Sequence, residues 1–590
     1  MTNQKQPVTT LLIRLWQHIS KRRRGQFGLL LVLMLLVSFA ETLSIGSVLP
    51  FLGVLTDPNR VFAHPSAQPI IQTLSLTEPK QLILPFTVIF GFAALIAGSM
   101  RLLLLWAGTR LSYAVGADLG INVYRRTLYQ PYSVHVARNS SEIIDGISGK
   151  TNTSVSIINM TLNLISSIGM LVAILLTLLL IEPSIALSAM GGFGLIYFII
   201  ISLTRKRLLV NSKVVARESI QLIKSLQEGL GGIRDVLING SQPTFCQIYS
   251  KADQPMRRAQ GTNQFISLAP RYAIEALCMV LIAGLAFMLI RQDEGITMAI
   301  PVLGTLALGA QRILPILQQA YGSWSSIQGD QASLKDTLEL LDQPLPEHAE
   351  RPKVEQISFN LQIKLNQVSF RYSTQTPWVI KNLSLSIPKG SRVGFVGVTG
   401  SGKSTLLDIV MGLLQPSEGT LVIDNETVTV GNNSAWQAHI AHVPQSIYLA
   451  DATIEENIAF GIPKSQIDSR LVRQAAQKAR IAEIVESWPN KYQTIVGERG
   501  ARLSGGQRQR LGIARALYKQ VDVIIFDEAT SALDNDTERE VMEAIEGLNE
   551  NLTILMIAHR TSTLKNCTQI VELGEGEIKR IGTYQELFPH

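Results

Sequence analysis

The sequence predicts an all-α membrane domain of six transmembrane helices fused to an α/β domain with a phosphate-binding loop. Three observations support this fold class. Of the 590 residues, 17% are charged and 46% are hydrophobic, whereas soluble proteins have about a quarter charged residues. Six long apolar runs lie between residues 27 and 320. The pattern G-x-x-x-x-G-K-[ST] follows in the C-terminal half, and a chain of this length exceeds one compact core.

The formal net charge of +7 has two interpretations, nucleic-acid binding and contact with a membrane surface. The basic clusters flank apolar runs, which favours the membrane surface, and no nucleic-acid partner is expected. The three cysteines are far apart and match neither a metal-ligand spacing nor a disulfide framework.

Residues 1–26 are expected to form a cytoplasmic amphipathic elbow. Leu11, Leu15 and Ile19 recur at helical spacing before the basic run from Lys21 to Arg24. A short capping helix without a membrane role is the open alternative. The apolar run that follows is too long for a signal peptide, so it is interpreted as a retained helix.

The transmembrane domain is assigned to residues 27–330. Its six helices are predicted at 27–55, 81–112, 154–181, 183–204, 267–290 and 296–320. The connections 113–153 and 205–266 are too polar for lipid, so the membrane helices are expected to continue through them into the cytoplasm. Their tips are predicted near 140–146 and 236–245.

The basic residues also predict the orientation. They precede the first helix and follow the second (Arg125, Arg126) and the fourth (Arg205 to Arg207). The positive-inside rule therefore predicts a multi-pass protein with both termini in the cytoplasm.

A linker is predicted at 331–354, where prolines accumulate, and an α/β domain at 355–590. Short β-branched runs alternate there with amphipathic segments, as in an α/β fold.

The loop from Gly397 to Ser404 follows an apolar strand and opens a helix, which is the context that a P-loop requires. Its glycines allow backbone N–H groups to surround phosphates at a helix N-terminus. Lys403 is expected to reach the β- and γ-phosphates of ATP and Ser404 to bind Mg²⁺. The residues assigned to nucleotide binding here are Gly397, Gly400, Ser401, Gly402, Lys403, Ser404 and Thr405.

A second apolar strand, 523–527, ends in two carboxylates. Asp527 is expected to hold Mg²⁺, and Glu528 is placed to act as the general base for the attacking water. Ser531 to Asp534 follow directly, and Asp534 is assigned to the nucleotide site.

The run from Leu503 to Gln507 is the most specific pattern in the chain, because a serine and two glycines at a helix start expose N–H groups to an anion. Residues 355–590 resemble the ABC ATPase family, which includes this signature. The resemblance assigns Ser504, Gly505, Gly506 and Gln507 to ATP. It also implies an adenine-stacking role for Tyr372, a Mg²⁺-sensing role for Gln445 and a γ-phosphate contact for His559. Ordinary core packing is the alternative for Tyr372 and His559.

The family resemblance implies a dimer, because in such proteins the P-loop of one subunit meets the signature of another. The chain has one of each, so a homodimer is the simplest assembly, and a heterodimer with a related half is the alternative. ATP binding is expected to close the pair and hydrolysis to reopen it.

The membrane domain resembles exporters with six helices per half, and more narrowly the bacterial lipid-linked oligosaccharide flippases. The matching stretches lie at 41–51, 130–132, 229–236, 270–275 and 312–315. This resemblance implies an amphiphilic, lipid-linked cargo, a pyrophosphate-linked oligosaccharide or a glycolipid, and a place in the bacterial inner membrane. A multidrug or peptide exporter is the alternative within this architecture, and a non-transporting ATPase acting on DNA or ribosomes is the alternative outside it.

Three arginines fall in or beside the apolar helices: Arg101, Arg271 and Arg312. Charges there are costly, so they are expected to face a watery cavity or a partner. Guanidinium groups bind phosphate oxygens bidentately, which suits a diphosphate cargo. The alternative is that Glu41 and Glu275 pair with these arginines and hold the bundle together, or that Arg101 and Arg271 extend to lipid headgroups.

Overall fold

A computed structural model describes the backbone of residues 6–56, 58–63, 68–73, 76–181, 183–290, 295–346, 349, 357–528, 539–540, 543, 547, 551–558 and 560–588. The chain divides into two compact units. The first comprises Met1–Gln130 and Arg138–Pro344, and the second comprises Pro131–Ala137 and Leu345–His590.

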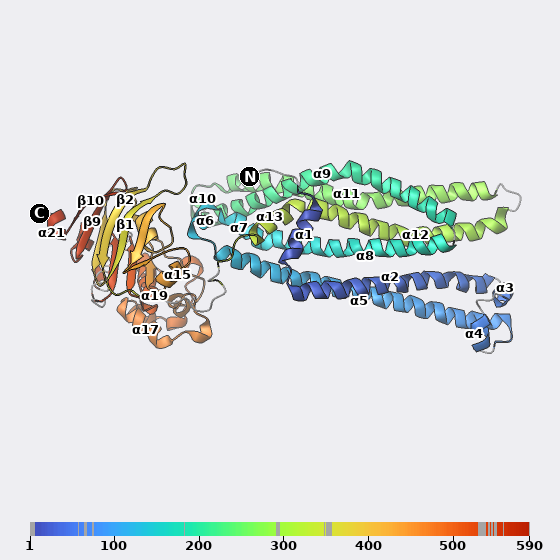
Figure 1. The fold of residues 1–590 in the computed structure, drawn as a ribbon, viewed down its shortest axis with the longest axis horizontal. Helices are drawn as coiled ribbons and strands as arrows, with labels where there is room; N and C mark the ends of the chain where they lie inside the picture. Colours follow the sequence, from blue (N-terminus) through green and yellow to red (C-terminus); the bar gives the residue numbers. More distant parts are fainter. Residues whose placement is uncertain are drawn as a thin grey trace. The chain divides into compact units, whose positions relative to one another are not determined.

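Long helices build the first unit (Figure 1). They are α1 (Val8–His18), α2 (Lys21–Thr56), α5 (Ile83–Leu128), α8 (Thr151–Ile181), α9 (Pro183–Gly231), α11 (Gln242–Ile290), α12 (Gly295–Gly329) and α13 (Gln331–Leu341). Short elements connect them: α3 (Pro58–Phe62), α4 (Gln68–Thr73), η2 (Pro79–Leu82), α7 (Ser140–Asp145), η3 (Gly146–Lys150) and α10 (Ile233–Ile238). Helix α5 pairs with α2, α8 with α12, and α9 with α11.

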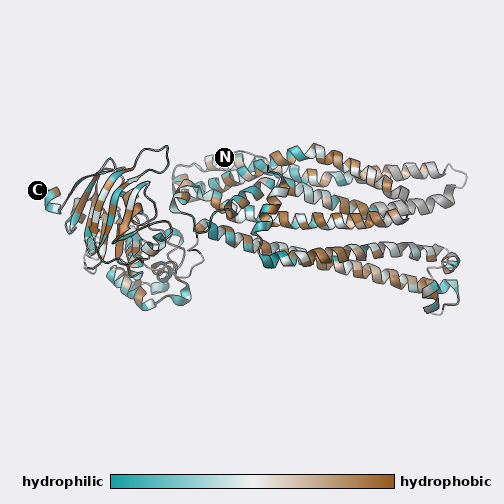
Figure 2. Ribbon diagram, viewed as in Figure 1, coloured by the Kyte–Doolittle hydropathy of each residue, from teal (hydrophilic) through white to brown (hydrophobic). Residues whose placement is uncertain are grey.

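The length and apolarity of these helices fit a bilayer. The 49 residues of α9 span about 74 Å, more than twice a hydrocarbon core of about 30 Å. Among the described residues, Lys21–Ser44, Pro79–Leu128 and Ser140–Leu176 are each long and apolar enough to cross a membrane. Figure 2 shows the hydrophobic residues along α2, α5 and α8. Helices also cover the predicted spans 183–204, 267–290 and 296–320, which contain side chains outside the described set.

The two predicted tips have different outcomes. At the second, α10 ends at Ile238 and α11 begins at Gln242, inside the predicted interval 236–245. At the first, α5 already ends at Leu128, and the short helix α6 (Tyr132–Ala137) groups with the second unit. The predicted tip near 140–146 is therefore about ten residues too late, because Pro131 favours an earlier break.

The expected linker 331–354 also differs from the structure. Its first part is helix α13, whose Leu334, Leu338 and Leu341 are buried in the core that α1, α2, α5 and α8 share. Asp342 then pairs with Arg14 and with His18 of α1, at 2.8 Å from the imidazole Nε2. Burial opposes ionisation of Asp342, but its hydrogen bonds to Arg14 and His18 lower its pKa overall. The helical unit thus extends to Pro344.

The second unit contains two sheets. The antiparallel sheet has the order β2-β1-β4-β5, with β2 (Ile380–Pro388), β1 (Gln362–Phe370), β4 (Glu418–Ile423) and β5 (Glu426–Thr427). The larger sheet has the order β10-β9-β3-β8-β7-β6, with β10 (Glu577–Gly582), β9 (Gln569–Gly574), β3 (Arg392–Val396), β8 (Thr553–Ile557), β7 (Val523–Asp527) and β6 (Ile440–Val443). All its pairs are parallel except β10 with β9.

The parallel sheet separates two hydrophobic cores. Strand β7 is buried on both faces: Ile524 and Phe526 enter one core, while Val523 and Ile525 enter the other. Helix α14 (Lys403–Val410) packs in the second core, and α19 (Gly505–Tyr518) packs in the first with α16 (Ile454–Ile458), α17 (Ser469–Lys478) and α18 (Ala482–Ser487). Helices α15 (Asn433–Gln437) and α21 (Tyr584–Leu587) complete the α-helices that the structure places in this unit. The two glycine-rich motifs therefore start helices on different cores of one domain.

Candidate nucleotide site and membrane cavity

The loop between β3 and α14 adopts a conformation that only glycine tolerates at two points. Gly397 has φ +146°, and a Cβ there would lie 2.1 Å from the carbonyl oxygen of Leu573. Gly402, the N-cap of α14, has φ +97°, and a Cβ there would lie 2.7 Å from Ile380 Cδ1. These positions hold the backbone close to β9 and β2, with the N-terminus of α14 behind the loop. The loop fits a phosphate group.

Lys403 lies within this loop rather than extending from it. Its Nζ donates to the carbonyl oxygens of Gly397 at 2.8 Å and Val398 at 3.0 Å. Burial lowers the pKa of Lys403, while the nearby carboxylates of Glu528 and Asp527 oppose that shift. A polyphosphate entering the loop would offer the ammonium group a stronger, charged acceptor than two carbonyls.

The end of β7 brings the acidic pair to the same loop. Asp527 is the last residue of the strand, and Glu528 follows with φ +48°, a conformation that costs free energy for a non-glycine residue. The Nε2 of Gln445 donates to Glu528 Oε2 at 2.6 Å. Two residues that are 83 positions apart thus meet where the hydrolytic water is expected.

The donor set also fits Mg²⁺. No cluster of three or more His, Cys, Asp or Glu suited to a metal exists within the described ranges. Ser404 is exposed at the start of α14, Gln445 is exposed, and Asp527 is partly exposed. One carboxylate, one hydroxyl and one amide are hard oxygen donors, and Mg²⁺ usually completes such a shell with water and substrate phosphates.

Ser504 is the N-cap of α19. Its hydroxyl accepts from the Gln507 N–H at 3.2 Å, and the Gln507 side chain accepts from the Ser504 N–H at 2.9 Å, a capping box. Ser504 and Gly505 are exposed, and Gly506 and Gln507 are partly exposed. Helix α19 therefore presents a free N-terminal turn to solvent. It packs in the first hydrophobic core, whereas α14, which follows the P-loop, packs in the second.

Tyr372 follows β1 and is 52% exposed, so it is not a core residue. Its ring meets Phe370 edge-on, with 5.1 Å between centroids, and its hydroxyl lies 3.1 Å from Thr405 Oγ1 of α14. An exposed ring anchored beside the P-loop helix suits stacking on a base. Asp534 and His559 lie outside the described residues.

Of the three arginines predicted on the membrane side, two form ion pairs with the predicted glutamates. Arg101 of α5 forms an ion pair with Glu41 of α2, whose side chain is almost fully buried. Arg271 lies 3.7 Å from Glu275 one turn along α11, and both are half exposed. The side chain of Arg312 lies outside the described residues. Pairing with glutamates, the open structural alternative, is therefore present for two of the arginines.

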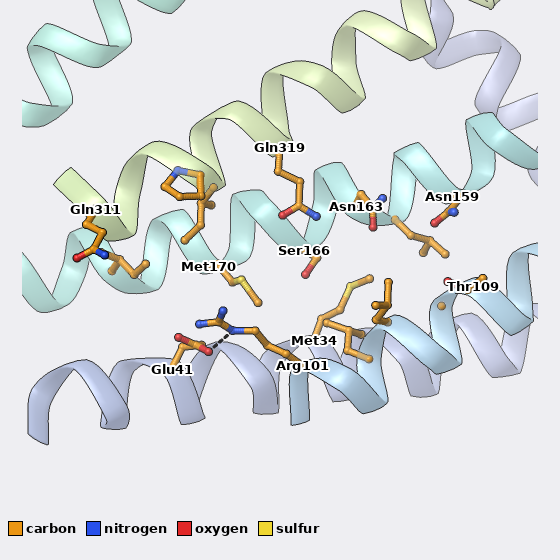
Figure 3. Close-up of a pocket in the computed structure, with 17 residues that line it drawn as sticks. Met34, Glu41, Arg101, Thr109, Asn159, Asn163, Ser166, Met170, Gln311 and Gln319 are labelled. Atoms are coloured by element: carbon orange, nitrogen blue, oxygen red, sulfur yellow. Dashed lines mark hydrogen bonds and ion pairs between the residues drawn. The ribbon is translucent and has the colours of Figure 1, made fainter. Parts of the chain in front are cut away.

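A cavity of about 370 Å³ lies in the helical unit beside the Glu41–Arg101 pair (Figure 3). Neither Arg271 nor Glu275 is among the residues that line it. Its polar lining includes Asn159, Asn163, Ser166, Gln311 and Gln319. Within the part of the chain that the structure describes, none of these five side chains has a hydrogen bond to protein.

The sequence-based assignment missed these amides. Asn159, Asn163 and Ser166 follow at i, i+4 and i+7 in α8, so one helical face carries them toward the cavity. The sequence did contain a signal for this cavity, namely polar side chains at helical spacing within an apolar run. Such groups in membrane helices usually face a cavity or the bundle interior.

Large parts of the chain are similar to known families and proteins. Residues 380–531 match the family described as "ABC transporter", and residues 27–299 match "ABC transporter transmembrane region". The "ATP-dependent lipid A-core flippase" of Alkalilimnicola ehrlichii is 31% identical over 410 residues, 68% of this chain and 67% of that protein. The flippase of the same name from Photobacterium profundum is 32% identical over 421 residues, 70% and 68%. "Heterocyst differentiation ATP-binding protein HepA" of a Nostoc species is 30% identical over 395 residues, 66% and 63%. The solved structure of a bacterial Atm1-family ABC exporter with ATP bound has the same fold, with a TM-score of 0.76 and 23% identity over 96% of both chains.

Proposed function

The chain belongs to the ABC transporter family and is an ATP-driven exporter, and from this premise we propose that its cargo is a lipid-linked oligosaccharide or glycolipid with an anionic head. It takes this cargo from the cytoplasmic leaflet of the bacterial inner membrane, with both termini in the cytoplasm. The observation that supports this cargo most directly is the cavity, which among the described side chains combines Arg101 with a row of amides that form no hydrogen bond to protein.

The lining suits two parts of such a cargo. The Arg101 guanidinium can exchange its partner Glu41 for phosphate oxygens, which guanidinium groups bind bidentately. The amides of Asn159, Asn163, Gln311 and Gln319 offer both donors and acceptors, which sugar hydroxyl groups match. A purely apolar drug would displace water from these amides without replacing its hydrogen bonds, at a cost of about 1–3 kcal/mol for each amide that it covers.

The ATPase domain drives the movement as a homodimer. Lys403 holds the β- and γ-phosphates, the exposed N-terminus of α19 binds the partner's nucleotide, and Glu528 takes the proton from the attacking water. Gln445 keeps the Glu528 carboxylate in position. When bound by Ser404, Asp527 and Gln445, Mg²⁺ would supply charge neutralisation on the phosphates. ATP favours the closed pair of domains, and hydrolysis releases it.

The first test separates cargo binding by Arg101 from a structural role. Arg101→Gln should lower the unfolding temperature, because it removes a cationic partner from the almost fully buried carboxylate of Glu41. The double variant Glu41→Gln with Arg101→Gln should recover most of that stability, since no charge is left unpaired. Flipping of a fluorescent lipid-pyrophosphate sugar in vesicles should nevertheless stay at least about tenfold below wild type, while basal ATPase persists.

Wild-type flipping by the double variant would show that the pair is structural and that Arg101 does not recognise the cargo. The same assay on Arg271→Ala, Arg312→Ala and the triple alanine variant tests the other two arginines. Unchanged flipping in all of these variants would contradict the proposal that the arginines recognise an anionic head of the cargo.

The amide row has its own test. Asn163→Leu with Gln319→Leu should slow flipping of the sugar-bearing lipid about tenfold, because the sugar loses hydrogen bonds worth about 0.5–1.5 kcal/mol each. Flipping of the same lipid pyrophosphate without sugar should not change. Thr161→Val is the matched control, because it removes a polar group from α8 outside the cavity. Equal slowing of both lipids would contradict sugar recognition by the amides.

A further inference from the structure

A second pocket of about 350 Å³ lies in the helical unit, between the start of α1, helix α9 and the junction of α12 with α13. Two hydrogen bonds hold its walls together. The Gln331 side chain donates to the carbonyl oxygen of Gln6 at 2.7 Å, and the backbone N–H of Ala332 donates to Ser212 Oγ at 2.8 Å. The pocket is thus a fixed feature of the fold, separate from the cavity beside Arg101.

The lining is strongly basic. Arg205, Lys206 and Lys213 of α9 and Lys335 of α13 all line it, and none of the described lining residues is acidic. Lys335 has a neighbour, Glu339, at 3.6 Å, and both side chains are well exposed. The three cations of α9 form no ion pair with any other residue in the described ranges. This concentration of unpaired positive charge favours an anion.

The lining also includes apolar side chains, Val8 and Leu11 of α1 and Leu209 and Val210 of α9, next to the polar residues Gln6, Ser212, Gln328 and Gln331. Val210 is 55% exposed. An anion bound here would therefore also contact hydrocarbon. A free phosphate has no group that uses these side chains, whereas a phospholipid has its glycerol backbone and the first carbons of its acyl chains.

The pocket lies where a bilayer surface is expected. The basic run Arg205 to Arg207 ends an apolar stretch of α9 whose exposed side chains include Leu195, Phe198 and Leu203. Exposed large apolar side chains on a membrane helix face lipid, and the basic residues that follow mark the headgroup level. Basic pockets between helices at this level bind anionic headgroups.

From these observations we infer that this pocket binds the headgroup of an anionic phospholipid. Phosphatidylglycerol fits the charge, whereas the choline of phosphatidylcholine would add a positive charge to a basic site. The lipid bridges α1, α9 and α13, and so fixes the elbow helix against the bundle. The inference is independent of the cargo proposal, because it uses none of the cavity residues.

The test compares two pairs of substitutions on the same helix. Lys206→Gln with Lys213→Gln removes two charges from the pocket, and Arg217→Gln with Lys224→Gln removes two exposed charges of α9 outside it. Each full-length protein is placed in nanodiscs of phosphatidylcholine with 30% phosphatidylglycerol, released into mild detergent and analysed by native mass spectrometry. The pocket variant should retain about tenfold less phosphatidylglycerol than wild type, and the control pair should equal wild type.

Lys206→Arg with Lys213→Arg keeps the charge and should retain the lipid. Equal retention by the pocket variant and the control pair would overturn the site. Equal retention of phosphatidylcholine by the wild type would overturn its selectivity for anionic lipid. Displacement of the lipid by glycerol 3-phosphate, which lacks acyl chains, would mean that the pocket binds a soluble phosphate instead.

Discussion

Glu528→Gln should abolish steady-state ATP hydrolysis while leaving ATP bound and the two nucleotide domains closed. Loss of a general base lowers the rate about 10²–10⁴-fold. The amide keeps the shape of the side chain, and the unusual backbone at φ +48° costs Gln about as much as Glu, so the fold should be unaffected. Lys403, Ser404 and Asp527, which we assign to Mg-ATP, should still bind it. Phosphate release and retention of labelled ATP measure the two effects.

Asp527→Asn is the informative contrast. It removes a carboxylate that we assign to the metal rather than to the water, so it should weaken ATP retention as well as turnover. Phosphate release near the wild-type rate from Glu528→Gln would remove Glu528 from the role of base. Loss of ATP retention in both variants would mean that Glu528 serves binding rather than chemistry.

Ser504→Asp should likewise stop hydrolysis, and here the damage should fall on the partner's nucleotide. The aspartate keeps the helix cap, because its carboxylate still accepts from the Gln507 N–H, so the unfolding temperature should not fall. In the proposed homodimer, however, its negative charge would lie opposite the partner's phosphates, because the N-terminus of α19 is exposed. Ser504→Ala instead loses the cap, at a cost of about 1 kcal/mol, without adding charge.

Co-expression with Lys403→Ala tests which subunit the signature serves. A mixed dimer has one site with both defects and one intact site. Random pairing makes about half of the dimers mixed, so turnover should return to about a quarter of the wild-type value if one site acts alone. Each variant expressed alone should be inactive. A monomer with full ATPase activity would end the homodimer proposal, and full activity of Ser504→Asp alone would remove the signature serine from the site.

The family, the fold class and the ATPase activity were predictable from the sequence, and the comparisons confirm them. Their signals are contiguous. The P-loop requires a strand, glycines and a helix start within about a dozen residues, and the signature requires a cap and two glycines in one turn. Backbone geometry over such short stretches follows from the residue types themselves, so spacing alone identifies them.

The tertiary structure decided what depends on distant packing. It paired Glu41 with Arg101, which is 60 positions away, and Gln445 with Glu528, which is 83 positions away. It ended α5 at Leu128, where the polar connection had suggested a tip near 140–146, and it packed α13 on the helical unit, where the prolines had suggested a linker. It also turned one face of α8 toward a cavity and gathered four cations into a pocket. Helix periodicity fixes which residues share a face, but only contact between helices far apart in the chain decides what that face meets.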